Sequence, residues 1–122
     1  MESGTLGRAF GDGETIIRQG DEGDCMYVIQ SGTVDVVRQV DGKEVRIATR
    51  SQGEFFGEMS IFEREVRMAT VRARGPVQVI TVDKKNLMRR IQEDPSLAFR
   101  LLQSMSSRLR ELSGEVAHRK TS

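Results

Sequence analysis

The chain has few residues of the kinds from which covalent and metal chemistry is built. Its 122 residues include one cysteine, Cys25, and one histidine, His118. A single cysteine cannot close a disulfide within the chain, which fits a reducing compartment, and we expect a cytoplasmic location. With one cysteine and one histidine, no metal cluster and no cofactor are expected. No Ser/His or Cys/His pair is evident either, so we expect that the protein is not an enzyme.

Long hydrophobic runs and a large charge of one sign are also missing. No apolar run approaches the ~20 residues that span a membrane, and the N-terminus has no signal-peptide pattern. The net charge is +1, so the molecule as a whole has no electrostatic pull toward nucleic acid or membrane. We therefore expect no membrane contact and no direct nucleic-acid contact. The length favours a single domain over 1–122 with a hydrophobic core.

Short segments rich in Val, Ile and Thr, bounded by Gly, Asp or Pro, fill the first two thirds of the chain and predict strands. They cover residues 14–18, 25–30, 33–40, 43–49, 67–74 and 77–83. Asp41-Gly42 predicts a two-residue hairpin, and Gly75-Pro76 predicts another tight turn. Many short strands followed by helices are typical of a sandwich or jelly roll with helices packed at one end.

The hydrophobic period changes after residue 83 and predicts two helices. The first covers 84–92, and Asp94-Pro95 predicts a cap followed by proline at the start of the second, which we expect to end at about His118. Along the second helix an apolar heptad seam is formed by Ala98, Leu102, Met105, Leu109, Leu112 and Val116. The seam either packs on the domain's own sheet or pairs with a second copy in a homodimer.

The segment from Gly57 to Thr70 is the strongest candidate site. It places Glu58 and Arg67 on either side of a stretch that can form one helical turn. A carboxylate can accept a hydrogen bond from a ribose hydroxyl, and an arginine can donate two to phosphate oxygens. Backbone N–H groups at the start of the turn can donate to the same anion, and Gly57 allows close approach. An ordinary surface ion pair between Glu58 and Arg67 is the alternative.

The residues on both sides of this segment resemble the cyclic nucleotide-binding domain family, the regulatory module of the catabolite activator, of protein kinase A regulatory subunits and of nucleotide-gated channels. The similarity rests on the glycine-punctuated stretch 10–34, a phosphate-binding cassette over 56–70 and two closing helices. It implies a mainly β fold with α, in which a β jelly-roll (double-stranded β-helix) barrel over 1–83 is followed by C-terminal helices over 84–118 and a tail over 119–122. It also implies a regulatory sensor that binds a cyclic nucleotide without hydrolysing it and transmits binding through its C-terminal helices.

The resemblance also implies roles for single residues. Glu58 would hold the ribose 2′-hydroxyl and Arg67 the cyclic phosphate. Backbone N–H groups of Ser60 and Ala69 would complete the anion cage. The other candidate contacts within the cassette are Gly57, Met59 and Met68.

Further candidate contacts lie outside the cassette. Val36 and Ile47 match positions that contact the base in the bacterial activators, although core packing explains two apolar strand residues equally well. Ser113, near the end of the last helix, would reach the adenine amino group, while Leu112 would only cover the base.

Two residues of the cassette depart from the family pattern and bear on the choice of ligand. Val66 replaces a frequent proline, and Met68 stands where the family often has Ala, Ser or Thr. A hydroxyl there can bond phosphate or a guanine edge, and a thioether does neither well. This favours cAMP as the ligand, with cGMP as the second choice.

Three interpretations of the whole chain fit the same sequence. The chain is either a stand-alone sensor or the ligand-binding part of a transcription regulator whose DNA-binding domain is absent from it. A module that kept the fold and no longer binds nucleotide is the third interpretation.

Overall fold

A computed structural model describes residues 6–58, 60–61 and 66–121 and, within these, the side chains of residues 7–110. The chain divides into two compact units, Met1–Asn86 and Leu87–Ser122. The first contains the strands and the candidate cassette. The second contains most of α2 and all of α3.

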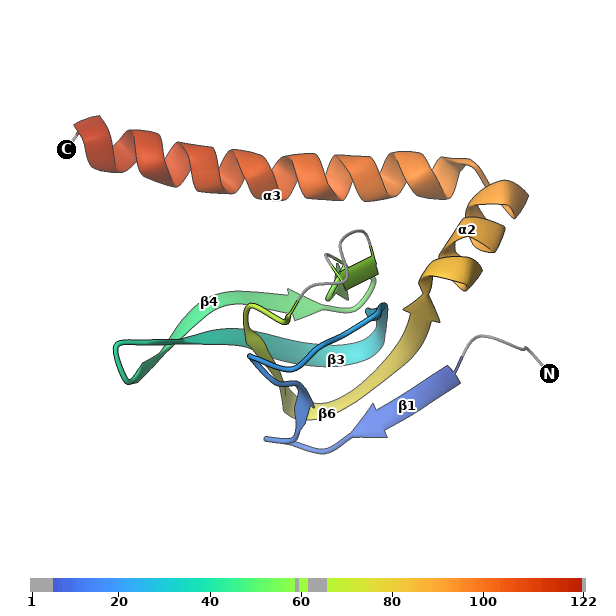
Figure 1. The fold of residues 1–122 in the computed structure, drawn as a ribbon, viewed down its shortest axis with the longest axis horizontal. Coiled ribbons are helices and arrows are strands. Elements are labelled where there is room, and N and C mark those ends of the chain that lie inside the picture. The colour runs from blue at the N-terminus through green and yellow to red at the C-terminus, as the bar shows by residue number, and fades with distance from the viewer. Residues whose placement is uncertain (1–5, 59, 62–65, 122) are drawn as a thin grey trace. The chain divides into compact units, whose positions relative to one another are not determined.

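The strands form one six-stranded antiparallel sheet, in which the order β1-β6-β3-β4 is extended by β2 on β6 and β5 on β3 (Figure 1). The two long strands β3 and β6 pair along most of their length, which brings distant parts of the sequence side by side. The strands are β1 (Leu6–Phe10), β2 (Thr15–Ile17), β3 (Cys25–Val40), β4 (Lys43–Ser51), β5 (Phe55–Phe56) and β6 (Thr70–Asp83).

The hydrophobic core of the sheet unit is built from β-branched and aromatic side chains on one face of these strands. Val34 and Val79 are fully buried, and the ring of Tyr27 stacks on that of Phe56 with centroids 5.1 Å apart. Such residues are favoured in strands because they pack well on a pleated surface. The remaining members of the core cluster are Ile17, Ile29, Val71, Ala73 and Val77.

The hairpin predicted at Asp41-Gly42 is confirmed. Val40 of β3 pairs with Lys43 of β4, and both turn residues have positive φ, 53° and 77°. Positive φ at both central positions is the geometry that follows the twist of the flanking strands.

The prediction of a tight turn at Gly75-Pro76 is wrong. β6 runs unbroken through both residues, and its register against β3 shifts between Ser31↔Gln78 and Thr33↔Arg74. The extra residues on β6 therefore form a bulge, which bends the strand without ending it. Opposite the bulge lies Gly32, where a Cβ would collide with the carbonyl oxygen of Pro76.

Other strand boundaries also differ from the prediction. The two strands predicted over 25–30 and 33–40 are the single strand β3, and the strand expected to begin at Arg67 begins at Thr70. β1 was not predicted, because Leu6–Phe10 has no β-branched residue and owes its strand form to pairing with β6.

The two helices predicted after the strands are present, α2 (Lys84–Glu93) and α3 (Ser96–Thr121). Asp83 caps α2, since its carboxylate accepts a hydrogen bond from the backbone N–H of Asn86 at 2.8 Å. The carboxylate of Asp94 does the same for Ser96 at the start of α3, at 3.2 Å. α3 continues to Thr121 and does not end near His118. Among the described helices none is long and apolar enough to cross a membrane.

Candidate functional site

The guanidinium group of Arg67 is the centre of the candidate site. Arg67 is only 9% exposed. Its Nη1 donates to the backbone oxygen of Gly57 at 2.9 Å, and its Nη2 donates to the backbone oxygen of Cys25, also at 2.9 Å. Both acceptors are neutral, so these hydrogen bonds orient the guanidinium without neutralising its charge. The sequence left open a surface ion pair between Glu58 and Arg67, and the burial of Arg67 does not fit a surface position.

The backbone of Arg67 is fixed by a segment more than forty residues earlier in the chain. Its N–H donates to the carbonyl of Asp21 at 2.7 Å, and its carbonyl accepts from the N–H of Gly20 at 3.0 Å. An antiparallel bridge between Glu22 and Val66 extends this pairing. The cassette arginine is therefore held at both its backbone and its guanidinium by residues 20–25 and by Gly57.

The other end of the cassette follows β5 directly. Gly57 has a φ of 78°, a conformation that glycine adopts without the steric cost of a Cβ. Glu58 is half-buried, and its carbonyl accepts a hydrogen bond from the N–H of Ile61 at 3.1 Å. Ser60 and Ile61 are helical and buried. These positions agree with the start of the predicted helical turn, and Met59 lies outside the described residues.

Val36 and Ile47, the two expected base contacts, lie close together on paired strands. Val36 pairs with Ala48 and Val37 with Arg46, so Ile47 is the extra residue of a β-bulge between them. Bulges often re-aim a side chain beside a binding site. Ile47 is 53% exposed, whereas Val36 packs on the core cluster. Core packing, the alternative to base contact, thus describes Val36 better than Ile47.

The remaining candidate residues occupy different settings. Met68 is 58% exposed and Val66 is 51% exposed, whereas Arg67 between them is buried. Ala69 is half-buried just before β6. Ser113 lies in α3, and its side chain is outside the described residues.

Tyr27 and Cys25 line the same end of β3 as the Arg67 site. Burial, aided by the neighbouring Cys25 thiol, raises the pKa of the Tyr27 hydroxyl above its usual value, and the positive charge of Arg67 acts in the opposite direction. The Cys25 sulfur lies 4.0 Å from Nη2 of Arg67. Tyr27 therefore stays neutral at physiological pH and adds no charge to the site.

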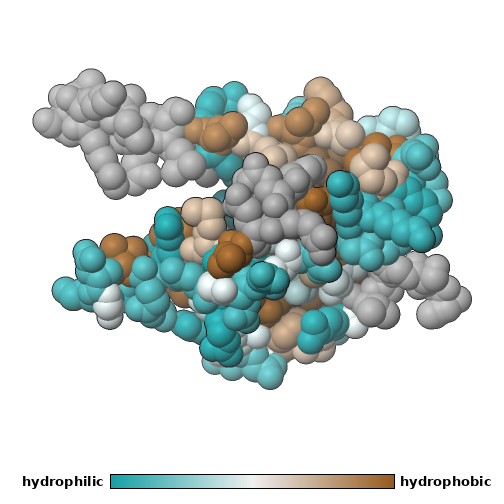
Figure 2. All heavy atoms as spheres, in the orientation of Figure 1, coloured by the Kyte–Doolittle hydropathy of each residue, from teal (hydrophilic) through white to brown (hydrophobic). Residues whose placement is uncertain are grey.

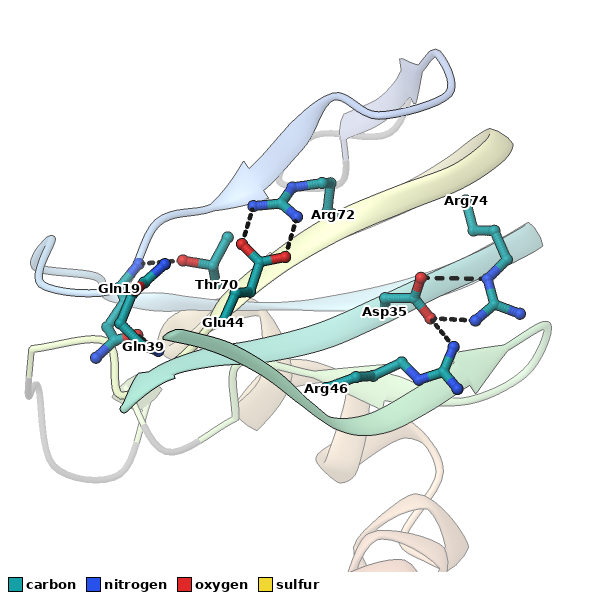
Figure 3. A network of polar contacts seen from close by, with 8 residues as sticks. All are labelled: Gln19, Asp35, Gln39, Glu44, Arg46, Thr70, Arg72 and Arg74. Carbon is teal, nitrogen blue, oxygen red and sulfur yellow. Dashed lines mark hydrogen bonds and ion pairs between the residues drawn. The ribbon is translucent and has the colours of Figure 1, made fainter. Parts of the chain in front are cut away.

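A second group of charged residues was not predicted from the sequence. Figure 3 shows it on β3, β4 and β6, and we call it the exposed polar cluster: Asp35, Glu44, Arg46, Arg72 and Arg74. Arg74 binds Asp35 through Nη2 at 2.7 Å and Nε at 3.2 Å, and Arg72 binds Glu44 through both Nη atoms at 2.8 and 3.1 Å. Only a register read across three strands brings these residues together, so no local pattern in the sequence could have indicated them.

The wider surface of the sheet unit is mixed. In Figure 2 it is mostly hydrophilic with scattered hydrophobic residues. Val40 and Val45, near the tip of the β3–β4 hairpin, are each about half exposed. Isolated apolar residues of this kind are normal on a protein surface. No group of three or more His, Cys, Asp or Glu side chains within the described part of the chain is placed to hold a metal ion.

Fold and site together define a mainly β domain in which a glycine-flanked cassette carries a buried arginine. The sequence-family model of the cyclic nucleotide-binding domain matches residues 7–94, more than half of the chain. The chain therefore belongs to the cyclic nucleotide-binding domain family, as the sequence resemblance indicated.

Individual relatives agree with this assignment. The chain is 40% identical over 93 residues to cGMP-dependent protein kinase egl-4 of Caenorhabditis elegans, a match that covers 72% of this chain and 12% of the kinase. It is 32% identical over 106 residues to the cAMP-activated global transcriptional regulator CRP of Pasteurella multocida, covering 85% of this chain and 51% of the regulator. The chain thus spans about half of that regulator and a small part of the kinase.

A solved structure confirms the fold. The catabolite activator protein of Thermus thermophilus superposes with a TM-score of 0.84 at 30% identity, over 93% of this chain and 54% of that one. The β jelly roll followed by two helices, expected from the sequence, is therefore the fold of this chain.

Proposed function

We propose that the chain is a sensor domain that binds a cyclic purine nucleotide, with cAMP favoured, and that it has no catalytic role of its own. The observation that carries this proposal is the setting of Arg67, a buried guanidinium oriented by the neutral carbonyls of Gly57 and Cys25. Because its charge is not neutralised by those acceptors, a phosphate that reaches it gains a charge-assisted hydrogen bond in a partly desolvated site.

The other contacts follow from the order of the cassette. The carboxylate of Glu58 accepts a hydrogen bond from the ribose 2′-hydroxyl. The backbone N–H groups of Ser60 and Ala69 donate hydrogen bonds to the phosphate near Arg67. Ile47, exposed at its bulge, provides an apolar surface for the base, and Ser113 is a further candidate contact for the base. Met59 and Met68 complete the candidate set. The half-burial of Glu58 supports its role, since a carboxylate shielded from water binds a hydroxyl more strongly.

The preference for cAMP rests on Met68. A thioether cannot offer the hydroxyl that would bond a guanine edge. The relatives point to both nucleotides, since one is named as a cGMP-dependent kinase and another as a cAMP-activated regulator. Both ligands therefore belong in the test.

Two features favour a regulatory output through the C-terminal helices. α2 begins at Lys84, directly after the last residue of β6, so no linker separates the strand from the helix. The seam residues Leu102 and Leu109 are 64% and 65% exposed on α3, more apolar surface than a solvated helix usually shows. We propose that this seam forms a homodimer, which sedimentation of the chain with and without cAMP tests. A chain that stays monomeric at high concentration in both states would exclude the dimer.

A transcription regulator is the second candidate function for the protein to which this domain belongs. It is favoured by the match to CRP, of which the chain covers about half. In that case the chain supplies the ligand sensor, and nucleic acid is contacted by a part of the protein outside it.

Isothermal titration calorimetry of the chain with cAMP and, separately, with cGMP tests the proposal directly. We expect saturable binding of both, tighter for cAMP. 5′-AMP, which has an open and doubly charged phosphate, serves as the control ligand for the cyclic form. Absence of heat and of thermal stabilisation with millimolar cAMP and cGMP would favour the module that no longer binds nucleotide.

A further inference from the structure

Gly23 lies directly against the guanidinium group of Arg67. A Cβ built on Gly23 would come within 2.5 Å of three atoms of that group, Nε, Cζ and Nη2. Atoms of this kind do not approach so closely in real structures, because van der Waals repulsion rises steeply at short range. Glycine is therefore the residue at this position that leaves room for the arginine where it lies.

The need for glycine here is one of space and not of backbone conformation. Gly23 is not among the glycines with positive φ. Several glycines in the neighbouring turns show the opposite combination: Gly13, Gly20 and Gly53 have positive φ, and a Cβ on any of them would meet no atom within 4 Å. Those glycines provide the backbone conformation of the turns, whereas Gly23 provides space for the side chain of Arg67.

Two hydrogen bonds oppose a displacement of the guanidinium. Its two terminal nitrogens are engaged with the carbonyls of Gly57 and Cys25. Gly57 also lies close to the guanidinium, since a Cβ there would be 2.9 Å from Nη1. A methyl group at position 23 must therefore break at least one of these hydrogen bonds or tilt the plane of the guanidinium.

We propose that Gly23 is a positioning residue for ligand binding: with Gly57 it forms a side-chain-free slot that holds Arg67 oriented for the phosphate before the ligand arrives. The proposal rests on the proposed function for the identity of the ligand. Such preorganisation raises affinity, because the cost of ordering a long side chain is met in folding and not in binding.

The first experiment compares two Gly→Ala variants by titration with cAMP. Gly23→Ala should raise Kd about tenfold or more, the change expected when a charge-assisted contact with the phosphate is misplaced. Gly7→Ala is the matched control, since Gly7 also lacks a positive φ and the nearest atom to its Cβ would be 4.0 Å away. It should change Kd less than about twofold. Equal Kd values for wild type and Gly23→Ala would overturn the proposal.

The second experiment needs no ligand, and it distinguishes positioning of Arg67 from a general loss of structure. The ¹⁵Nε–¹H NMR resonance of Arg67, assigned by its disappearance in Arg67→Ala, should shift in Gly23→Ala and not in Gly7→Ala. Gly23→Ala should also lower Tm in the presence of Arg67 and leave Tm unchanged in the Arg67→Ala background, where the overlap no longer exists. An unmoved resonance, or an equal loss of Tm in both backgrounds, would assign Gly23 a merely structural role and overturn the proposal.

The two experiments separate failure of this inference from failure of the proposed function. If the wild type binds no cyclic nucleotide, the ligand assignment is wrong, and the resonance and the Tm cycle still decide whether Gly23 positions Arg67. If the wild type binds, the titrations decide whether that positioning matters for affinity.

Discussion

Arg67 and the arginines of the exposed polar cluster are held by different kinds of acceptor. Arg72 and Arg74 each form a two-pronged ion pair with a carboxylate on another strand of the sheet, Glu44 of β4 and Asp35 of β3, in positions open to solvent. Arg67 is buried and donates to the carbonyls of Gly57 and Cys25. The same kind of side chain is therefore paired with a carboxylate in one region and oriented by carbonyl oxygens in the other.

The difference explains why the Arg67 region is suited to a ligand and the exposed polar cluster is not. A guanidinium that already has a carboxylate partner gains little from a phosphate, because the two anions compete for the same donors. In water, ion pairs such as those of the exposed polar cluster add little to stability. A desolvated guanidinium whose hydrogen bonds go to carbonyl oxygens keeps most of its attraction for an incoming anion.

The largest expected effect comes from removing Arg67. Arg67→Ala should weaken cAMP binding by roughly 1.5–3 kcal/mol or more, at least about tenfold in Kd, because a charge-assisted contact with the phosphate is lost. The fold should remain intact by circular dichroism. Arg74→Ala removes an arginine of the exposed polar cluster and should leave Kd unchanged. Equal losses of affinity in the two variants would show that the charge of the domain, and not the site, attracts the ligand.

The next largest effect should come from Glu58. Glu58→Ala should raise the Kd for cAMP about tenfold, since a hydrogen bond to a charged group contributes roughly 1.5 kcal/mol or more. The substitution should raise the Kd for 2′-deoxy-cAMP less, because that ligand has no 2′-hydroxyl to donate a hydrogen bond to the carboxylate. Calorimetry with both ligands on both proteins completes the cycle. The ribose role would be excluded by the same loss for the two ligands.

A smaller change is expected at Met68, which is exposed beside the buried Arg67. Met68→Thr restores a hydroxyl and should improve binding of cGMP relative to cAMP by about 1 kcal/mol, the contribution of one added hydrogen bond. The ratio of the two Kd values is the quantity to measure. A ratio that stays constant would mean that this position does not set selectivity.

The smallest effect concerns the exposed polar cluster and pH. The hydrogen bonds from Arg72 hold the pKa of the Glu44 carboxyl below its usual value. A lowered folded-state pKa means that the pair stabilises the fold above the ordinary Glu pKa, and that this contribution is lost as pH falls through the lowered value. Tm of the wild type should therefore decline slightly more than that of Glu44→Gln between about pH 6 and about pH 3.

Affinity provides the control for this last experiment. Glu44→Gln should bind cAMP as the wild type does at neutral pH, since the exposed polar cluster is not the proposed site. A loss of affinity in this variant would break the distinction between the two regions.

The candidate site could be predicted from the sequence as far as its residue types and their order. Glycine at 57, a carboxylate at 58 and an arginine at 67 form a local pattern. Such a pattern can be recognised without knowledge of the fold. What the sequence could not indicate is that residues 20–25 enclose Arg67, because this contact joins segments more than forty residues apart. The role inferred for Gly23 belongs to this second kind of information.

The fold divides in the same way. The sequence by itself determined the features that depend on neighbouring residues: the hairpin at Asp41-Gly42, the capped start of α3, and the succession of strands and then helices. Turn chemistry and capping act within a few residues, so they can be inferred directly.

Only the tertiary structure decided the features that depend on a distant partner. Leu6–Phe10 becomes a strand because β6 supplies its hydrogen bonds, and Gly75-Pro76 becomes a bulge because the opposite strand, with Gly32 facing it, continues past it. Arg67 is buried for the same reason, since the backbone groups that fix it come from a remote loop. Backbone hydrogen bonds and packing across long sequence separations exist only once the chain has folded, and they override local preference where the two differ.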